Sequence, residues 1–74
     1  MIDRIKDILS KQLRVDITAI EDDANIMEDL RADSLDVVDM VMSIEEQFGI
    51  SVPDEDIASL KTVRDIADYV ERNM

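Results

Sequence analysis

Cysteine and histidine are both absent from this 74-residue chain, and their absence excludes several kinds of chemistry. Without cysteine there is no disulfide and no thiolate metal site. Without histidine the chain lacks the usual zinc ligand and the usual general base at neutral pH. The single glycine, Gly49, has no series of acidic ligands ahead of it, so a calcium loop of the EF-hand type is also absent. Nor does any pattern suggest a concave apolar pocket. We therefore predict no specific metal site and no enzymatic activity.

Long hydrophobic runs, glycine, proline and aromatic residues are scarce as well. No segment is apolar enough for a transmembrane span or a signal peptide, and the chain starts with Met, so the expected location is the cytoplasm. Apolar residues nevertheless make up 46% of the chain, which is too many for a disordered acidic tail. The length predicts one domain, residues 1–74, near the lower size limit for a core without cross-links. We expect it to be a monomer.

Acidic residues are abundant and unevenly distributed. The net charge is −11, and thirteen of the 19 acids lie between residues 21 and 56, where Arg31 is the only base. Such a surface repels phosphate backbones, so we predict no binding to nucleic acids. It should attract basic patches on other proteins and accelerate encounters with them. The alternative is that the acids serve solubility alone.

The spacing of apolar residues predicts a helix from about Asp3 to Leu13. The following residues, 15–33, are too many for a structureless loop in so small a domain. Apolar residues recur through this segment and should hold it across the helix ends, as an ordered connection. These residues are Val15, Ile17, Ile20, Ile26 and Leu30.

Two more helices are predicted in the C-terminal third. Pro53 can open a short helix over residues 54–59. Thr62 and Asp65 have the spacing of a capping box, which marks the start of a last helix. Its inner face would consist of Val63, Ile66, Ala67 and Val70. The predicted fold class is all-α: a small bundle of three main helices plus one short helix, with a long ordered loop between helices one and two.

The central helix should run from Asp33 or Ser34 to Phe48, with Asp33 as N-cap and Gly49 just beyond its end. It carries two apolar stripes on different sides. The larger, here called the inner stripe, consists of Val37, Met40, Val41, Ile44 and Phe48. The smaller, here called the outer stripe, consists of Leu35, Val38 and Met42. We predict that the inner stripe is buried and that the outer stripe stays exposed among acids, as partner surfaces do. The alternative is that neighbours bury both stripes.

Ser34 has no histidine to activate it, so it is a better candidate for an acceptor of a group than for a nucleophilic catalyst. A serine at a helix N-terminus lies where backbone N–H groups and the helix dipole stabilise an attached phosphate. The alternative is a simple capping role, which is common for serine at this position.

Four segments around and after this serine resemble a bacterial acyl carrier protein: DLRADSLD at 29–36, VMSIEEQFG at 41–49, ISVPDE at 50–55 and TVRD at 62–65. The resemblance extends over essentially the whole chain, including its length and acidity. It implies that a holo-acyl-carrier-protein synthase esterifies Ser34 with 4′-phosphopantetheine from coenzyme A. The thiol of this arm would carry acyl chains as thioesters between the enzymes of a dissociated, type II fatty acid synthase.

The resemblance also implies roles for the central helix. Its acids would dock on basic patches of fatty acid synthesis enzymes and acyltransferases, and the outer stripe would make the apolar contacts. The implied recognition residues are Asp33, Leu35, Asp36, Val38, Asp39, Met42, Glu45 and Glu46. The acyl chain would be sheltered between the helices, along the inner stripe of Val37, Met40, Val41, Ile44 and Phe48.

One residue departs from the family pattern, because Arg31 stands where the family commonly has glycine. If that glycine has a positive φ, arginine is disfavoured there. Two alternatives to a fatty acid carrier remain open. One is a polyketide, D-alanyl or peptidyl carrier, and the other is an acidic protein-interaction module with an unmodified Ser34.

Overall fold

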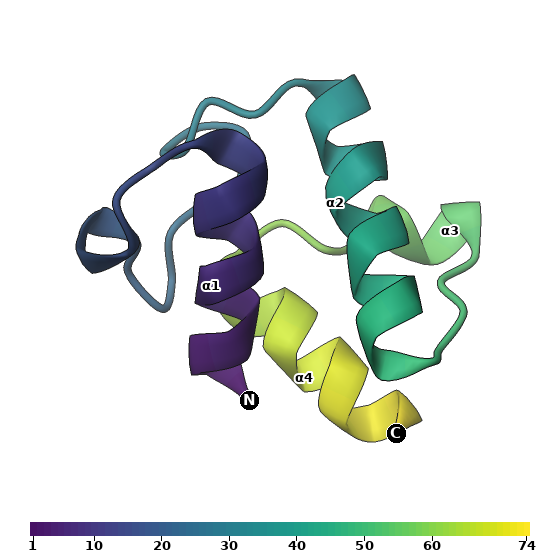
Figure 1. Ribbon diagram of the computed structural model, residues 1–74. Coiled ribbons are helices and arrows are strands. Elements are labelled where there is room, and N and C mark those ends of the chain that lie inside the picture. Colours follow the sequence, from purple (N-terminus) through teal and green to yellow (C-terminus); the bar gives the residue numbers. More distant parts are fainter.

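The computed structural model describes residues 1–74, and its regular elements are helices, with no β-strand. Three long helices, α1 (Ile2–Leu13), α2 (Ser34–Phe48) and α4 (Val63–Asn73), are joined by a 3-10 turn, η1 (Ile17–Ala19), and a short helix, α3 (Asp54–Ile57). Helices α1 and α2 lie side by side and run in opposite directions, and α4 crosses them at the end that holds both termini (Figure 1). The predicted all-α bundle with one short helix is confirmed. None of these helices combines the length and the apolar character that a membrane crossing requires.

Local sequence signals account for the ends of the central helix. The Asp33 carboxylate accepts a hydrogen bond from the Asp36 N–H at 2.9 Å, and the Asp36 carboxylate accepts one from the Asp33 N–H at 3.3 Å. This reciprocal pair satisfies N–H groups that the first turn leaves without helical partners. At the other end Gly49 adopts φ 64°, and its N–H donates to the carbonyl of Glu45. The predicted start and end of α2 are both correct.

The last two helices also begin where the sequence signals lie. Pro53 precedes α3, which ends at Ile57, two residues earlier than predicted. The Thr62 hydroxyl accepts from the Asp65 N–H, and the Asp65 carboxylate accepts from the Thr62 N–H, so the predicted capping box of α4 is formed.

The hydrophobic core lies between α1, α2 and α4, and all of its 17 buried residues are apolar. Each long helix contributes one stripe: Ile5, Ile8 and Leu9 from α1; Val37, Met40, Val41 and Ile44 from α2; Val63, Ile66, Ala67 and Val70 from α4. Full burial of a large apolar side chain contributes about 1.5–3 kcal/mol to folding. With no cross-link in the chain, these stripes are the main source of its stability.

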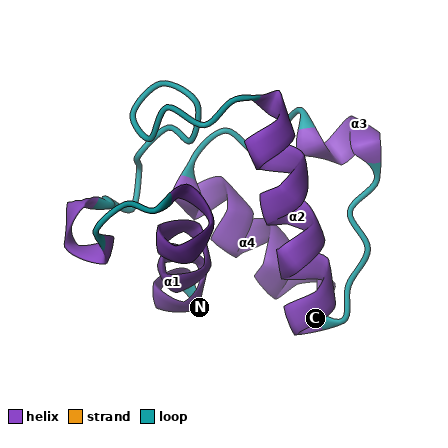
Figure 2. Cartoon of the chain, turned by 45° about the horizontal axis from the view of Figure 1, so that its top comes forward, coloured by secondary structure: helices purple, strands orange, loops and turns teal.

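The connection between α1 and α2 is ordered, as predicted (Figure 2). Backbone hydrogen bonds hold its middle beside the start of α4. Backbone bonds join Ile26 N–H to the Lys61 carbonyl at 2.9 Å and Val63 N–H to the Ala24 carbonyl at 3.1 Å. Two residues of the connection itself, Ile20 and Ile26, are buried. The prediction for Ile17 is wrong, however: its side chain is 40% exposed, because η1 projects away from the helix bundle.

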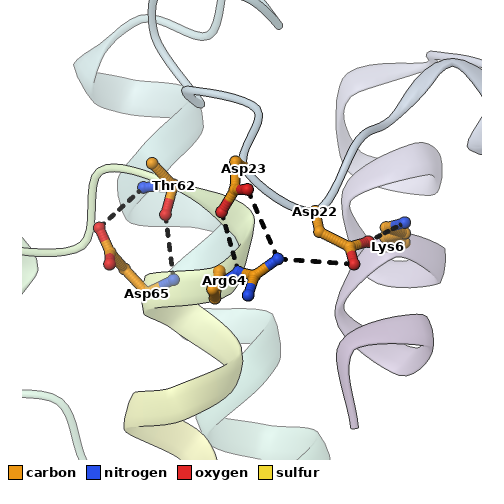
Figure 3. A network of polar contacts seen from close by, with 6 residues as sticks. All are labelled: Lys6, Asp22, Asp23, Thr62, Arg64 and Asp65. Carbon is orange, nitrogen blue, oxygen red and sulfur yellow. Dashed lines mark hydrogen bonds and ion pairs between the residues drawn. The ribbon is translucent and has the colours of Figure 1, made fainter.

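A network of ion pairs fixes the same connection to α1 and α4 (Figure 3). Lys6 of α1 contacts the Asp22 carboxylate at 2.5 Å, and Arg64 of α4 contacts Asp23 at 2.8 Å and Asp22 at 3.8 Å. The hydrogen bond from Lys6, reinforced by the charges of Lys6 and Arg64, lowers the pKa of Asp22. The network therefore joins two helices through the loop between them.

Two hydrogen bonds hold α3 and the segment before it against the bundle. The Tyr69 hydroxyl of α4 donates to the Asp56 carboxylate at 2.8 Å, and this bond raises the pKa of Tyr69. The Val52 N–H donates to the Glu45 carboxylate of α2 at 3.0 Å. Helix α3 is thus fixed on the side of α2 that faces away from α1 (Figure 1).

Candidate functional site

Ser34 is the first residue of α2, and its side chain is exposed. The preceding residue, Asp33, is the N-cap, so Ser34 is not needed for capping. The Ser34 hydroxyl makes no hydrogen bond within the chain. The structure therefore excludes the capping role that the sequence alone left open for this serine.

The other serines show how unusual an uncommitted hydroxyl is in this molecule. Ser10 and Ser59 donate to backbone carbonyls at 2.6 and 2.8 Å, and Ser43 accepts from a glutamine side chain. Only Ser51 is also exposed without a bond at its hydroxyl, and it lies in the extended segment after α2. Ser34 is thus the one unbonded serine hydroxyl at a helix N-terminus.

The two apolar stripes of α2 have opposite environments. In the inner stripe Val37, Met40, Val41 and Ile44 are buried, and Phe48 is half-buried under the guanidinium of Arg4, 4.8 Å from the ring centroid. In the outer stripe Leu35 is 73%, Met42 55% and Val38 45% exposed. The predicted burial is confirmed for all of the inner stripe except Phe48, which is half-buried, and the alternative that both stripes are buried is excluded.

The acids of α2 differ in whether they are engaged within the chain. Asp33 and Asp36 bond each other's backbone N–H groups, and Glu45 accepts from Val52. The carboxylates of Asp39 and Glu46 are exposed and make no hydrogen bond or ion pair. Among the acids of α2 and its N-cap, only these two carboxylates have no hydrogen bond or ion pair within the chain.

An apolar hollow of about 440 Å³ opens beside Ser34, although no sequence pattern suggested a pocket. Its volume lies in the range of small-molecule sites. Three segments form it: the start of α2, the turn at residues 25–28 and the stretch at residues 57–61. The lining residues are Asn25, Met27, Glu28, Ser34, Val37, Val38, Ile57, Ala58, Leu60 and Lys61.

The hollow overlaps only in part with the residues predicted to shelter an acyl chain. Val37 lines it, whereas Met40, Val41 and Ile44 are packed in the core. Val38, predicted as a recognition residue, lines the hollow as well. Most of its other walls come from the 25–28 and 57–61 segments, which carry no motif that links them to Ser34 in the sequence.

Arg31 has φ 58°, so the position where the family pattern has glycine does use the left-handed conformation. A non-glycine residue is disfavoured there by about 1–2 kcal/mol. The N–H of the next residue, Ala32, donates to the Ile26 carbonyl at 3.1 Å, and Ala32 is buried, which holds the turn in place. The Arg31 side chain is exposed and forms no ion pair.

This geometry suits a protein that bears a flexible prosthetic arm: an accessible hydroxyl at a helix N-terminus, beside an apolar hollow. Comparison with known proteins agrees. The family model described as "Phosphopantetheine attachment site" matches residues 3–70. The chain is 51% identical to an acyl carrier protein of Syntrophobacter fumaroxidans, over 95% of this chain and 86% of the relative. It is 48% identical to one of Bdellovibrio bacteriovorus, over 93% and 88%.

The chain therefore belongs to the acyl carrier protein family, whose bacterial members carry acyl chains on a 4′-phosphopantetheine group and serve fatty acid synthesis. The residues around Ser34 fit this group. The hydroxyl is free to form a phosphodiester, unbonded N–H groups of the first helical turn lie next to it, and the hollow offers an apolar surface. As carriers, members of the family have their acyl chains processed by separate enzymes.

Proposed function

We propose that Ser34 is the attachment residue for 4′-phosphopantetheine, through which this protein presents acyl thioesters to fatty acid synthesis enzymes. The single observation that carries this proposal is the exposed, unbonded hydroxyl of Ser34 in a first turn already capped by Asp33. With no cysteine in the chain, the thiol for thioester chemistry comes with the arm.

The chain itself catalyses no reaction in this proposal. Deprotonation of the Ser34 hydroxyl needs a base, and the chain has no histidine. The nearby carboxylates of Asp33 and Asp36 are engaged in the capping box. The Ser34 oxygen would attack the phosphorus that bears the pantetheine, the pyrophosphate bond of coenzyme A would break, and adenosine 3′,5′-bisphosphate would leave. The base that takes the Ser34 proton and the positive charge that the phosphates require would therefore come from the holo-acyl-carrier-protein synthase.

The attachment is tested with two serine variants, Ser34→Ala and the matched control Ser51→Ala. Each protein is incubated with coenzyme A and a cognate holo-synthase, and its intact mass is measured. We expect one added phosphopantetheine on the wild type and on Ser51→Ala, and none on Ser34→Ala. An unmodified wild type would favour the alternative of an acidic interaction module, and a modified Ser34→Ala would show that the attachment residue is another one.

We also propose the outer stripe and the acids around it as the docking surface for these enzymes. Support comes from the exposure of Leu35, Val38 and Met42, which lie next to the free carboxylates of Asp39 and Glu46. Apolar contacts surrounded by complementary charge are typical of such interfaces. The further members of the proposed surface are Asp33, Asp36 and Glu45, although their carboxylates also have partners within the chain.

The hollow beside Ser34 is the proposed entrance of the acyl shelter. Its apolar walls would receive the first carbons of the chain, and Val37 connects it to the rest of the inner stripe. A longer acyl chain would have to displace one of the remaining side chains of the inner stripe, which are buried or, for Phe48, half-buried. These are Met40, Val41, Ile44 and Phe48. Methionine adapts its shape more readily than branched side chains, so Met40 is the residue we expect to move first.

A monomer in the cytoplasm is the proposed working form. The outer stripe has three exposed apolar side chains, which is a small apolar area compared with obligate dimer interfaces. Sedimentation of the purified protein tests the monomer, and fractionation of the native host tests the location. A polyketide, D-alanyl or peptidyl carrier would be recognised by the acyl or aminoacyl group found on the protein isolated from that host.

A further inference from the structure

Lys61 is the only basic residue that lines the hollow beside Ser34. Its backbone is held on both sides. Its N–H donates to the Asp65 carboxylate at 3.3 Å, and its carbonyl accepts from the Ile26 N–H at 2.9 Å. The position from which this side chain extends is therefore fixed by α4 and by the connection between α1 and α2.

The ammonium group of Lys61 has no partner within the chain. Lys6, Lys11 and Arg64 form ion pairs, and Arg4 lies over the ring of Phe48. Glu28 is the only acid that lines the same hollow, and it is not within ion-pair distance of Lys61. Because the backbone of Lys61 is held and its ammonium group is unpaired, this positive charge is available to a ligand in the hollow.

We propose that Lys61 is a positioning residue for the prosthetic arm, and that its ammonium group pairs with the phosphodiester formed on Ser34. This inference rests on the proposed attachment at Ser34. The phosphodiester carries one negative charge and lies near the carboxylates of Asp33 and Asp36, which repel it. Lys61, which lines the same hollow as Ser34, offsets this repulsion.

The contact has a consequence for the arm. With its phosphate held by Lys61, the arm would begin at the hollow, whose apolar walls are then within reach of the acyl chain. An enzyme that withdraws the acyl chain must break this contact, which a basic docking patch can do by offering the phosphate another cation. Salt weakens the contact between Lys61 and the phosphate, so entry of the acyl chain into the hollow and its withdrawal by an enzyme would differ in their dependence on salt.

A thermodynamic cycle tests the proposal. The stability toward denaturant is measured for apo and holo forms of the wild type and of Lys61→Gln, after intact mass has established that each holo protein carries the arm. The matched control is Lys11→Gln, which removes the same charge at a lysine outside this hollow. We expect the arm and Lys61 to be coupled by a factor of about 2 to 5 in the unfolding equilibrium constant at low salt, and less in high salt.

The control separates a local contact from a general charge effect. Lys11 should show a coupling factor of about 1 with the arm. The ³¹P resonance of the holo protein should shift in Lys61→Gln and stay in place in Lys11→Gln. Absence of coupling at Lys61, or equal coupling at both lysines, overturns the inference while the attachment at Ser34 stands. If the mass measurement shows no arm on the wild type, the proposed attachment at Ser34 is wrong instead.

Discussion

The inner and outer stripes of α2 consist of the same kinds of residue on the same helix, yet one forms the core and the other faces solvent. Met40 is fully buried, whereas Met42, two positions further on, is 55% exposed. The difference arises because the hydrophobic core, to which α1 and α4 also contribute, lies against the side of α2 that carries the inner stripe. Apolar character along a helix thus identifies surfaces that need a partner, and the fold decides whether that partner lies in the same chain.

Truncating the two methionines should separate the roles of the stripes. Met40→Ala should lower the free energy of unfolding by about 2–5 kcal/mol, since it leaves a cavity in the core. Met42→Ala should change it by less than about 0.5 kcal/mol, as exposed substitutions do. Denaturant titration of both apo proteins measures this difference.

The same pair should differ in the opposite sense in docking. If the Met42 side chain is a contact of the interface, Met42→Ala should weaken the free energy of binding to the holo-synthase by about 1–2 kcal/mol. The dissociation constants of the two complexes measure this change. Under conditions where it remains folded, Met40→Ala should bind as the wild type does. Equal losses of stability in the two variants would contradict the assignment of the stripes.

A second experiment sharpens the comparison at the hollow, where the two stripes meet. Each methylene of an acyl chain that enters it should stabilise the protein by about 0.8 kcal/mol, so that stability rises with chain length until the hollow is full. Ala58→Phe, which fills the hollow, should abolish this rise, and Ala19→Phe, outside it, should not. Thermal unfolding of the acyl series measures both. A rise that persists in Ala58→Phe would place the shelter elsewhere.

The two arginines with positive φ allow a smaller test. Arg31 has φ 58° and Arg14 φ 57°, so replacing either one by glycine should relieve similar backbone strain and raise stability by about 0.5–1 kcal/mol. Arg31 lies two residues before Asp33 of the docking surface, whereas Arg14 lies at the end of α1, so we expect only Arg31→Gly to alter association with the holo-synthase. If Arg14→Gly changes association equally, the effect reflects net charge and not position.

The smallest expected effect concerns pH. The pKa of Asp22 is lowered by Lys6 and Arg64, so its contribution to stability is complete above the ordinary value of 3.8 and is lost as pH falls through the lowered value. Unfolding free energies measured from pH 5 down to pH 2 should therefore converge for the wild type and Asp22→Asn. Asp68→Asn, whose carboxylate has no partner in the chain, serves as the control. A constant difference between the wild type and Asp22→Asn would show that Asp22 acts by packing alone.

Much of the fold was predictable because its signals are local. The capping boxes at Asp33 and Thr62, the terminal Gly49 and the apolar spacing of each helix act within one or two turns of chain. The exposed Ile17 shows the limit of this reasoning. An apolar residue in a connection can be buried only where another element covers it, and no local signal reports that.

Local signals and family resemblance together pointed to Ser34, α2 and the two stripes, since a serine at a capped helix start and apolar periodicity need no knowledge of distant residues. Which acids are free, which hydroxyl lacks a partner, and where the hollow lies depended on packing. Residues 25–28 and 57–61 are separated along the chain and reach Ser34 only after the connection pairs with the start of α4. Contacts between distant segments determine such a cavity, and for that reason Lys61 became visible as part of the site only in three dimensions.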